Sequence, residues 1–309
     1  MRKFLIFVLL IFFNNNICNA SNNIKIKFKV ENEIITNIDL KKEEQYLISL
    51  NKNLQNIPKF ELSKLAQKSL LNEKIKKKTL ENFFDLSKNY QITEKQFINM
   101  FSNLGFKSEI EFNDYLISFG LSAEFLKNKL KIEGLWNKLI YDKFRGQVKV
   151  DKNKIKKEIS NLEQKSLDTK EYFIKEILFK LEPKEQLDEK YQLIVSSIYK
   201  NGFETAANIY SLSESSKYGG NIGWVKKIHL IDKISKEVEN LKIGEISKVI
   251  EFPNGYLIIQ VNDIRMVENK FNVNKEIDKR VNSEIDRQLN ELSLVFFNKV
   301  KQKIIISEL

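Results

Sequence analysis

The fold of this chain is decided by one stretch, Tyr210-Ser211-Leu212-Ser213-Glu214-Ser215-Ser216-Lys217-Tyr218-Gly219-Gly220-Asn221-Ile222-Gly223-Trp224. Three glycines within five residues indicate a turn in which the backbone lies close to its neighbours. A glycine-rich loop can also bind a phosphate, but such a site needs a helix directly after the loop, and none is predicted here. We therefore interpret the stretch as a closely packed loop that joins structured elements.

Strands and helices predicted on both sides of this loop form a compact α+β unit with a small antiparallel sheet. The predicted elements are a strand over 172–181, helices ending near Lys200, starting at Phe203 and covering 233–241, and strands over 246–252 and 256–264. Pro253-Asn254-Gly255 is predicted to be the turn between the last two strands, because proline presets the first turn residue and glycine accepts positive φ.

The N-terminal half is predicted to be mainly helical after a short hairpin over 25–36, where apolar residues alternate with lysines. Thr36 with Asp39 forms a capping box that starts a helix. Apolar spacing predicts a second helix over 60–86, and Thr93 with Gln96 reads as another capping box.

Two later helices are predicted to begin at Ser122 and Asp151, and the polar stretch 157–169 marks a domain boundary. In the tail, apolar residues recur at spacings of three and four from Ile277 to Val300. Such a stripe needs a partner surface. We expect the two ends of the chain to pack together around the α+β unit.

The first twenty residues read as a cleaved signal peptide: a basic start, an apolar run of ten over 4–13, and small residues before Ser21. A spanning helix needs about 20 apolar residues, so we expect no stable membrane anchor. A short uncleaved anchor is one alternative. A lipoprotein anchored at Cys18 is another, although Ile17 occupies the position where a small residue is needed.

The formal net charge of +11 would allow binding to nucleic acid or to an anionic membrane. Lysines are spread along the whole chain, and an exported protein rarely meets nucleic acid, so we expect no nucleic-acid partner. The sequence has one histidine, His229, and one cysteine, which together cannot supply the usual metal ligands. We predict no metal site and no cofactor, and we interpret His229 as a surface or helix-capping residue.

Residues 172–265 resemble the parvulin family of peptidyl-prolyl isomerases. The pieces that carry the resemblance are Phe173 to Leu178, Tyr210-Ser211, Gly219-Gly220-x-x-Gly223-Trp224, Leu241-x-x-Gly244-Glu245, and Gly255-Tyr256 through Arg265. The N-terminal motifs Val30-Glu31-Asn32-Glu33-Ile34-Ile35 and Asn37-Ile38-Asp39 are similar to the SurA family of periplasmic chaperones. That family commonly has two parvulin domains, whereas this chain has room for one.

The resemblance implies an α+β fold with four parts. These are a signal peptide over 1–20, a SurA-like helical domain over 21–169, a parvulin-like domain over 170–267, and a C-terminal helix over 268–309 that completes the helical domain.

The resemblance also places the family's site. Its two histidine positions fall on Glu176 and Leu257, and its acidic or cysteine position in the loop falls on Ser213. Glutamate can accept a hydrogen bond and serine can donate one, but leucine can do neither. The expected substrate-binding residues are Ile222, Leu230, Ile234 and Tyr256.

The implied function is that of a periplasmic chaperone that binds unfolded polypeptides, with outer-membrane β-barrel proteins as clients. We expect clients to lie in an apolar groove between the N-terminal helices and the C-terminal helix. Isomerisation has a barrier of about 18–20 kcal/mol and needs a site that favours the twisted amide. Loss of both histidines therefore favours peptide binding over catalysis. A working parvulin isomerase, or a structural protein whose helices only dimerise, are the alternatives.

Overall fold

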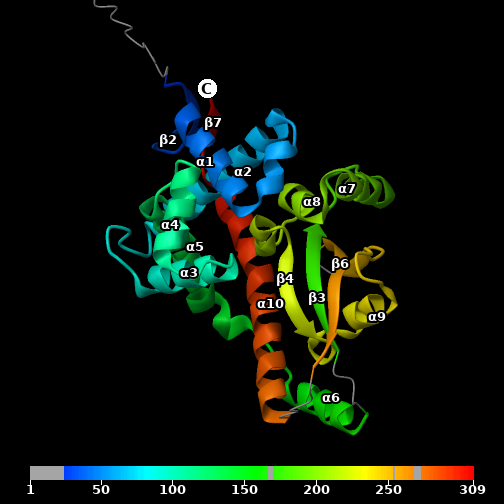
Figure 1. Ribbon diagram of the computed structural model, residues 1–309. Helices are drawn as coiled ribbons and strands as arrows, with labels where there is room; N and C mark the ends of the chain where they lie inside the picture. The colour runs from blue at the N-terminus through cyan, green and yellow to red at the C-terminus, as the bar shows by residue number, and fades with distance from the viewer. Residues whose placement is uncertain (1–23, 166–169, 253–254, 268–272) are drawn as a thin grey trace, which may run out of the picture.

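The computed structural model describes residues 24–165, 170–252, 255–267 and 273–309 (Figure 1). The predicted signal peptide and most of the predicted turn at 253–255 lie outside these ranges. The fold is α+β, as the sequence predicts. Figure 1 shows a helical lobe and an α+β unit side by side, with the long helix α10 (Val273–Lys301) running between them.

The helical lobe begins with the hairpin of β1 (Ile26–Val30) and β2 (Glu33–Thr36). The predicted capping box is confirmed, because the Thr36 hydroxyl accepts from the Asp39 N–H and the Asp39 carboxylate accepts from the Thr36 N–H. The helices that follow are α1 (Asn37–Leu50), α2 (Lys59–Leu80), α3 (Gln91–Asn103), α4 (Glu109–Ser118) and α5 (Ala123–Phe144). Helix α6 (Lys152–Lys165) lies apart from them and packs on the first half of α10 (Figure 1). Ser122 and Asp151 cap α5 and α6 as predicted.

Two predictions in this lobe were wrong. Helix α2 ends at Leu80 instead of 86, because the chain turns there and so brings Phe84 and Leu86 onto the cluster around Trp136. The second capping box does not form. Helix α3 starts two residues before Thr93, and the Thr93 N–H donates to the carbonyl of Tyr90.

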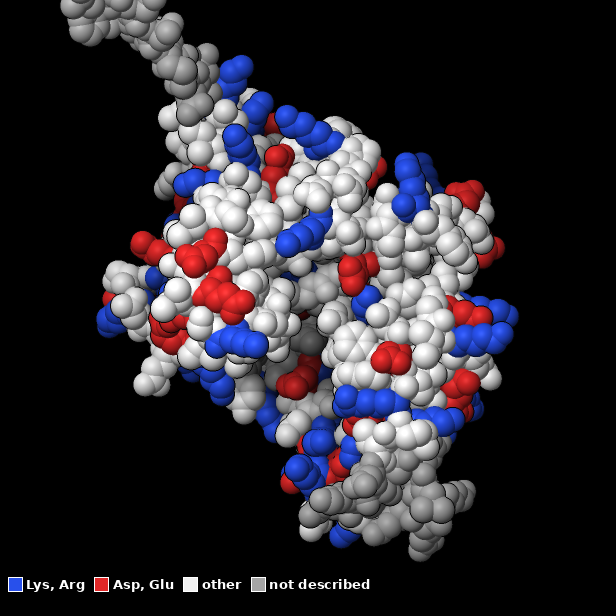
Figure 2. Space-filling model, in the orientation of Figure 1, with Lys and Arg blue, Asp and Glu red and all other residues white. Residues whose placement is uncertain are grey.

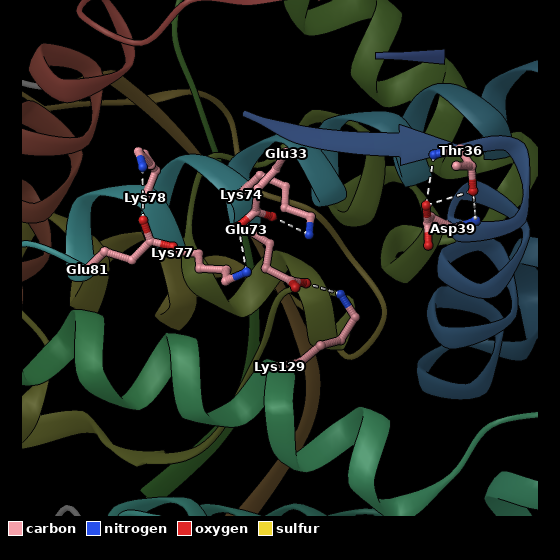
Figure 3. A network of polar contacts seen from close by, with 9 residues as sticks. All are labelled: Glu33, Thr36, Asp39, Glu73, Lys74, Lys77, Lys78, Glu81 and Lys129. Carbon is pink, nitrogen blue, oxygen red and sulfur yellow. Dashed lines mark hydrogen bonds and ion pairs between the residues drawn. The ribbon is translucent and has the colours of Figure 1, made fainter. Parts of the chain in front are cut away.

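Ion pairs fasten the hairpin and α1 to the longer helices (Figure 3). The Glu33 carboxylate of β2 accepts from Lys74 and Lys77 of α2, at 2.6 and 2.5 Å. Deeper in the lobe, Lys129 of α5 lies 2.7 Å from the fully buried Glu43 carboxylate and also contacts Glu73. Burial raises the pKa of Glu43, although the ammonium group of Lys129 opposes that rise.

The apolar stripe of α10 lies against the helical lobe. The Trp136 ring of α5 is 5.6 Å from the Phe296 ring and 6.0 Å from the Phe297 ring, and its N–H donates to the Ser293 hydroxyl at 2.9 Å. Leu289 is buried in the same cluster. Side chains of α5 and α10 therefore fill the space between the two helices. Along this stretch of described residues, the open groove that we expected is absent.

The chain ends in β7 (Ile306–Glu308), which the sequence analysis did not predict. It pairs antiparallel with β1, giving a sheet of order β2-β1-β7. Three residues are too few for a period to show, and only the partner strand makes them a strand.

The α+β unit contains β3 (Lys170–Phe179), α7 (Leu187–Asn201), α8 (Phe203–Tyr210), the 3-10 turn η3 (Glu214–Tyr218), β4 (Asn221–Lys226), η4 (Lys227–His229), α9 (Asp232–Asn240), β5 (Ile250–Phe252) and β6 (Gly255–Met266). Its antiparallel sheet has the order β4-β3-β6-β5. Helices α7 and α8 cover one face and α9 covers the other.

Strand β4 was missed, because it lies within the glycine-rich stretch that we interpreted as a loop. Glycine weakens a strand by itself. Here pairing with β3 compensates, and the Phe173 and Trp224 rings lie 5.4 Å apart. Strand β5 is shorter than predicted: it begins at Ile250, and Ile246 makes only an isolated bridge to Gln260.

Candidate functional site

The candidate site is centred on Glu176, in the second half of β3. Successive side chains of a strand point to opposite faces, so Glu176 shares a face with Leu178 and with the α9 cluster. Before β4 begins, the chain from 211 to 220, which we call the site loop, lies along the same edge of β3. The Glu176 N–H donates to the Gly220 carbonyl at 2.8 Å, and the Leu212 N–H donates to the Leu178 carbonyl at 2.7 Å.

Two hydroxyls of the site loop converge on the Glu176 carboxylate. Ser213 donates to Oε1 at 2.6 Å and Ser215 donates to the same oxygen at 3.0 Å. The two hydroxyl oxygens are 3.1 Å apart. The structure thus brings together two of the three positions on which the family's site residues fall, Glu176 and Ser213. It adds Ser215, for which the only sequence signal was its spacing of two from Ser213.

Two glycines allow the site loop to approach β3 this closely. Gly220 has φ of +76°, and a Cβ there would lie 2.3 Å from the Glu176 carbonyl oxygen. Gly219 has φ of +66°, and a Cβ there would lie 2.7 Å from Cβ of Glu204. Close packing of the turn, predicted from the sequence, is confirmed at both positions.

Leu257, the third of these family positions, lies on β6 directly opposite Leu178 and is 5% exposed. Its cluster also contains the half-buried Leu230 and Ile234, so these three predicted residues are brought together on the face of Glu176. Leu257 is therefore a buried apolar residue on the same face of the sheet as Glu176, two positions along β6 from Ile259, which pairs with Glu176.

The other two predicted substrate-binding residues lie elsewhere. Ile222 is on edge strand β4 and is 46% exposed. Tyr256 points to the opposite face of the sheet, where its ring lies 5.6 Å from Phe179 in the cluster under α7 and α8. Alternation along β6 explains this, because Tyr256 and Leu257 are neighbours and must point apart.

His229 does not have the surface or helix-capping position that we predicted. Its Nε2 contacts the buried Glu276 carboxylate of α10, and Lys226 contacts the same group at 2.9 Å. Arg280 donates to the His229 carbonyl. Burial lowers the pKa of His229 despite the nearby carboxylate. The histidine therefore helps to hold the α+β unit on α10. No cluster of three or more metal-ligating side chains occurs among the residues placed by the structure.

Residues 176–263 match the sequence profile of the PPIC-type PPIASE domain family of rotamases. This part of the chain is a PPIC-type rotamase domain. The match covers most of the α+β unit, and it confirms the parvulin resemblance. We refer to the α+β unit as the rotamase domain from here on.

Curated relatives of the chain are chaperones and foldases. It is 29% identical over 313 residues to the periplasmic chaperone PpiD of Buchnera aphidicola, which covers 98% of this chain and 44% of PpiD. It is 25% identical over 240 residues to the foldase PrsA of Bacillus subtilis, covering 76% of this chain and 71% of PrsA.

The chaperone SurA of Pseudomonas putida is 24% identical over 162 residues, covering 50% of this chain and 38% of SurA. The similarity to SurA predicted from the sequence is thus confirmed. The chain spans less than half the length of PpiD and of SurA. In the described part of the rotamase domain and the helical lobe, no helix is long and apolar enough to cross a membrane.

Proposed function

We propose that this protein is a periplasmic chaperone for unfolded polypeptides, with outer-membrane β-barrel proteins as its clients. We further propose that its rotamase domain binds extended peptide with little isomerase activity. The relatives support the general function, since their names describe chaperones and foldases and that of PpiD includes the periplasm. The signal-like segment over 1–20 supports export.

One observation carries the proposal for the rotamase domain: the Glu176 carboxylate is bound by hydroxyl groups, and a buried leucine, Leu257, lies on the same face of the sheet. Glu176 already accepts from Ser213 and Ser215, and Leu257 has no polar atom to offer a twisting peptide bond. Catalysis requires contacts that are stronger in the transition state than in either planar form. Apolar contact with a bound peptide requires no such preference.

The surface that we propose for peptide lies where the rotamase domain faces α10. Figure 1 shows β4 next to α10, and Figure 2 shows the molecule hollowed between the two lobes. Tyr218 and Ile222, on η3 and β4, are 44% and 46% exposed. We propose this hollow (Figure 2) as the client surface in place of the groove expected between α10 and the N-terminal helices, because side chains of α5 and α10 pack against one another there.

A working isomerase is the second candidate. The hydrogen bond of 2.6 Å between Ser213 and Glu176 favours it, because this pair keeps one donor and one acceptor at the family's positions. If that pair catalyses isomerisation, Glu176→Gln should abolish turnover of a proline peptide.

The test compares two activities of one preparation of the mature protein. Suppression of aggregation is measured with a urea-unfolded β-barrel protein, and cis–trans exchange is measured by NMR on a short proline peptide. We expect clear suppression and little acceleration, and we expect Ile222→Asp to weaken suppression. Ile110→Asp is the matched control, since Ile110 is an exposed isoleucine (76%) on α4, in the helical lobe. Exchange as fast as with an active parvulin, lost in Glu176→Gln, would establish the isomerase instead.

A further inference from the structure

We infer that Glu133 of the helical lobe is a positioning residue for the rotamase site. It acts through Lys217. By binding this lysine, Glu133 holds in place the site loop that carries Ser213 and Ser215. The site is then a product of both lobes, although Ser213, Ser215 and Gly220, which hydrogen-bond to Glu176, all belong to the rotamase domain. This inference rests on the proposed function only for the claim that the site binds peptide.

The first tether is an ion-paired triad across the interface between the lobes. The Glu133 carboxylate of α5 lies 2.5 Å from the Lys217 ammonium group of η3 and 2.6 Å from that of Lys76 on α2. Glu133 is 24% exposed and Lys217 is 34% exposed. Burial opposes ionisation of Glu133, but the two ammonium groups outweigh it and hold its pKa well below the usual range. The same carboxylate raises the pKa of Lys217 against the effect of burial.

The second tether joins the helical lobe to the neighbouring residue of the same turn. Asn51, which caps the end of α1, donates from its side chain to the Asn208 side-chain oxygen at 2.7 Å. Asn208, on α8, donates to the Ser216 carbonyl at 2.5 Å. Two consecutive residues of η3, Ser216 and Lys217, are therefore both connected to the helical lobe.

The tethered turn contains one of the two hydroxyls that bind Glu176, that of Ser215, and the other, that of Ser213, directly precedes it. Ser213 and Ser215 lie four and two positions before Lys217. Within the loop, the Ser215 carbonyl accepts from the Gly220 N–H at 2.9 Å, and the Ser216 carbonyl accepts from the Gly219 N–H at 3.1 Å. A short 3-10 turn at a domain surface belongs to the part of a protein that opens most easily. We conclude that the contact with the helical lobe keeps the two hydroxyls on the carboxylate.

The hairpin contains a matched control for Glu133. Glu33 also accepts from two lysines, Lys74 and Lys77, at 2.6 and 2.5 Å. The Glu33 side chain is 24% exposed, as is that of Glu133, and contact with two lysines lowers the pKa of Glu33 as well. Glu33 lies entirely within the helical lobe, so Glu33→Gln removes an equivalent charge without touching the site loop.

The experiment follows amide hydrogen exchange of the full mature chain by mass spectrometry, so it needs no peptide ligand. In Glu133→Gln and in Lys217→Met, we expect segment 211–220 to exchange about tenfold faster, the equivalent of losing one charged hydrogen bond of about 1.4 kcal/mol. Segments from β3 and β6 should exchange as in the wild type. Lys217→Arg keeps the charge, so segment 211–220 should exchange as slowly as in the wild type. Glu33→Gln should also leave the exchange rate of this segment unchanged.

Unchanged exchange of segment 211–220 in both Glu133→Gln and Lys217→Met would overturn the inference. Equal acceleration in β3 and β6 would overturn it as well, since Glu133 would then stabilise the whole protein and not the loop. Titration of each variant with a proline tetrapeptide then tests binding separately. Local acceleration without any binding to the wild type would contradict the proposed function and leave the positioning role standing.

Discussion

Replacing Leu289 by alanine tests whether α10 is an integral part of the helical lobe. Leu289 is 8% exposed and lies in the cluster that contains Leu135 and Trp136. Truncation of buried leucine costs about 2–5 kcal/mol. The neighbours Ile285 and Phe296 are only partly buried and can relax into the space, so we expect a loss of about 2–3 kcal/mol for the helical lobe.

The two tryptophans of the chain make the assay specific, because each lobe contains one of them. Trp136 is fully buried in the helical lobe, and Trp224 lies on β4 of the rotamase domain. Urea unfolding followed by fluorescence in a Trp224→Phe background reports on the helical lobe. The same measurement in a Trp136→Phe background reports on the rotamase domain. Leu289→Ala should lower the first midpoint and leave the second nearly unchanged.

Val295→Ala provides the control on the same helix, since Val295 is 59% exposed. Substitutions at such surface positions change stability by about 0.5 kcal/mol or less. If Leu289→Ala had no larger effect than Val295→Ala on the Trp136 transition, the structural assignment of α10 to the helical lobe would be refuted.

Three further predictions concern the site loop, pH and export. Gly220→Ala should unfold the loop locally and abolish peptide binding, because its Cβ would lie 2.3 Å from the Glu176 carbonyl; rapid exchange of segment 211–220 would show this. The pKa of Glu133 is lowered from 4.5 in the folded state, so its contribution is complete well above that pH and is lost as the pH falls below it. Protection of segment 211–220 from hydrogen exchange should therefore differ between Glu133→Gln and the wild type at pH 7, and by a smaller factor at pH 3, while β3 and β6 stay unchanged. N-terminal sequencing of protein from the cell envelope should begin at Ser21, and a retained Met1 would contradict cleavage.

Much of the fold could be predicted because its signals are local. The Thr36–Asp39 capping box spans four residues, and the cap at Ser122 binds an N–H three positions later. The helical period of α10 and the turn at Gly219-Gly220 likewise depend on neighbours in the sequence. For the same reason, errors arose where distant contacts overrode local preference, as at the end of α2.

The candidate site could be predicted only in part. Glu176 and Ser213 were found through the resemblance, and the structure joins them by a hydrogen bond. Whether these positions and Leu257 have the roles that the resemblance implies stays a prediction. Tyr256 was grouped with Leu230 and Ile234 although the pleat of β6 sends it to the other face. Alternation of side chains along the predicted strand 256–264 already separates Tyr256 from its neighbour Leu257.

Local patterns and the family resemblance were enough to predict the α+β class, most helices, the tight glycine turn and where the rotamase domain lies along the chain. Three features depend on the packing of distant parts of the chain: residues 306–308 form a strand on β1, His229 contacts Glu276, and Glu133 contacts Lys217. The last two pairs are separated by 47 and 84 positions in the chain. A periodic pattern shows which face of an element is buried, but it carries no information about which distant element covers that face. The choice of partner is made when the lobes pack together, because burial leaves each charged group stable only beside an opposite charge.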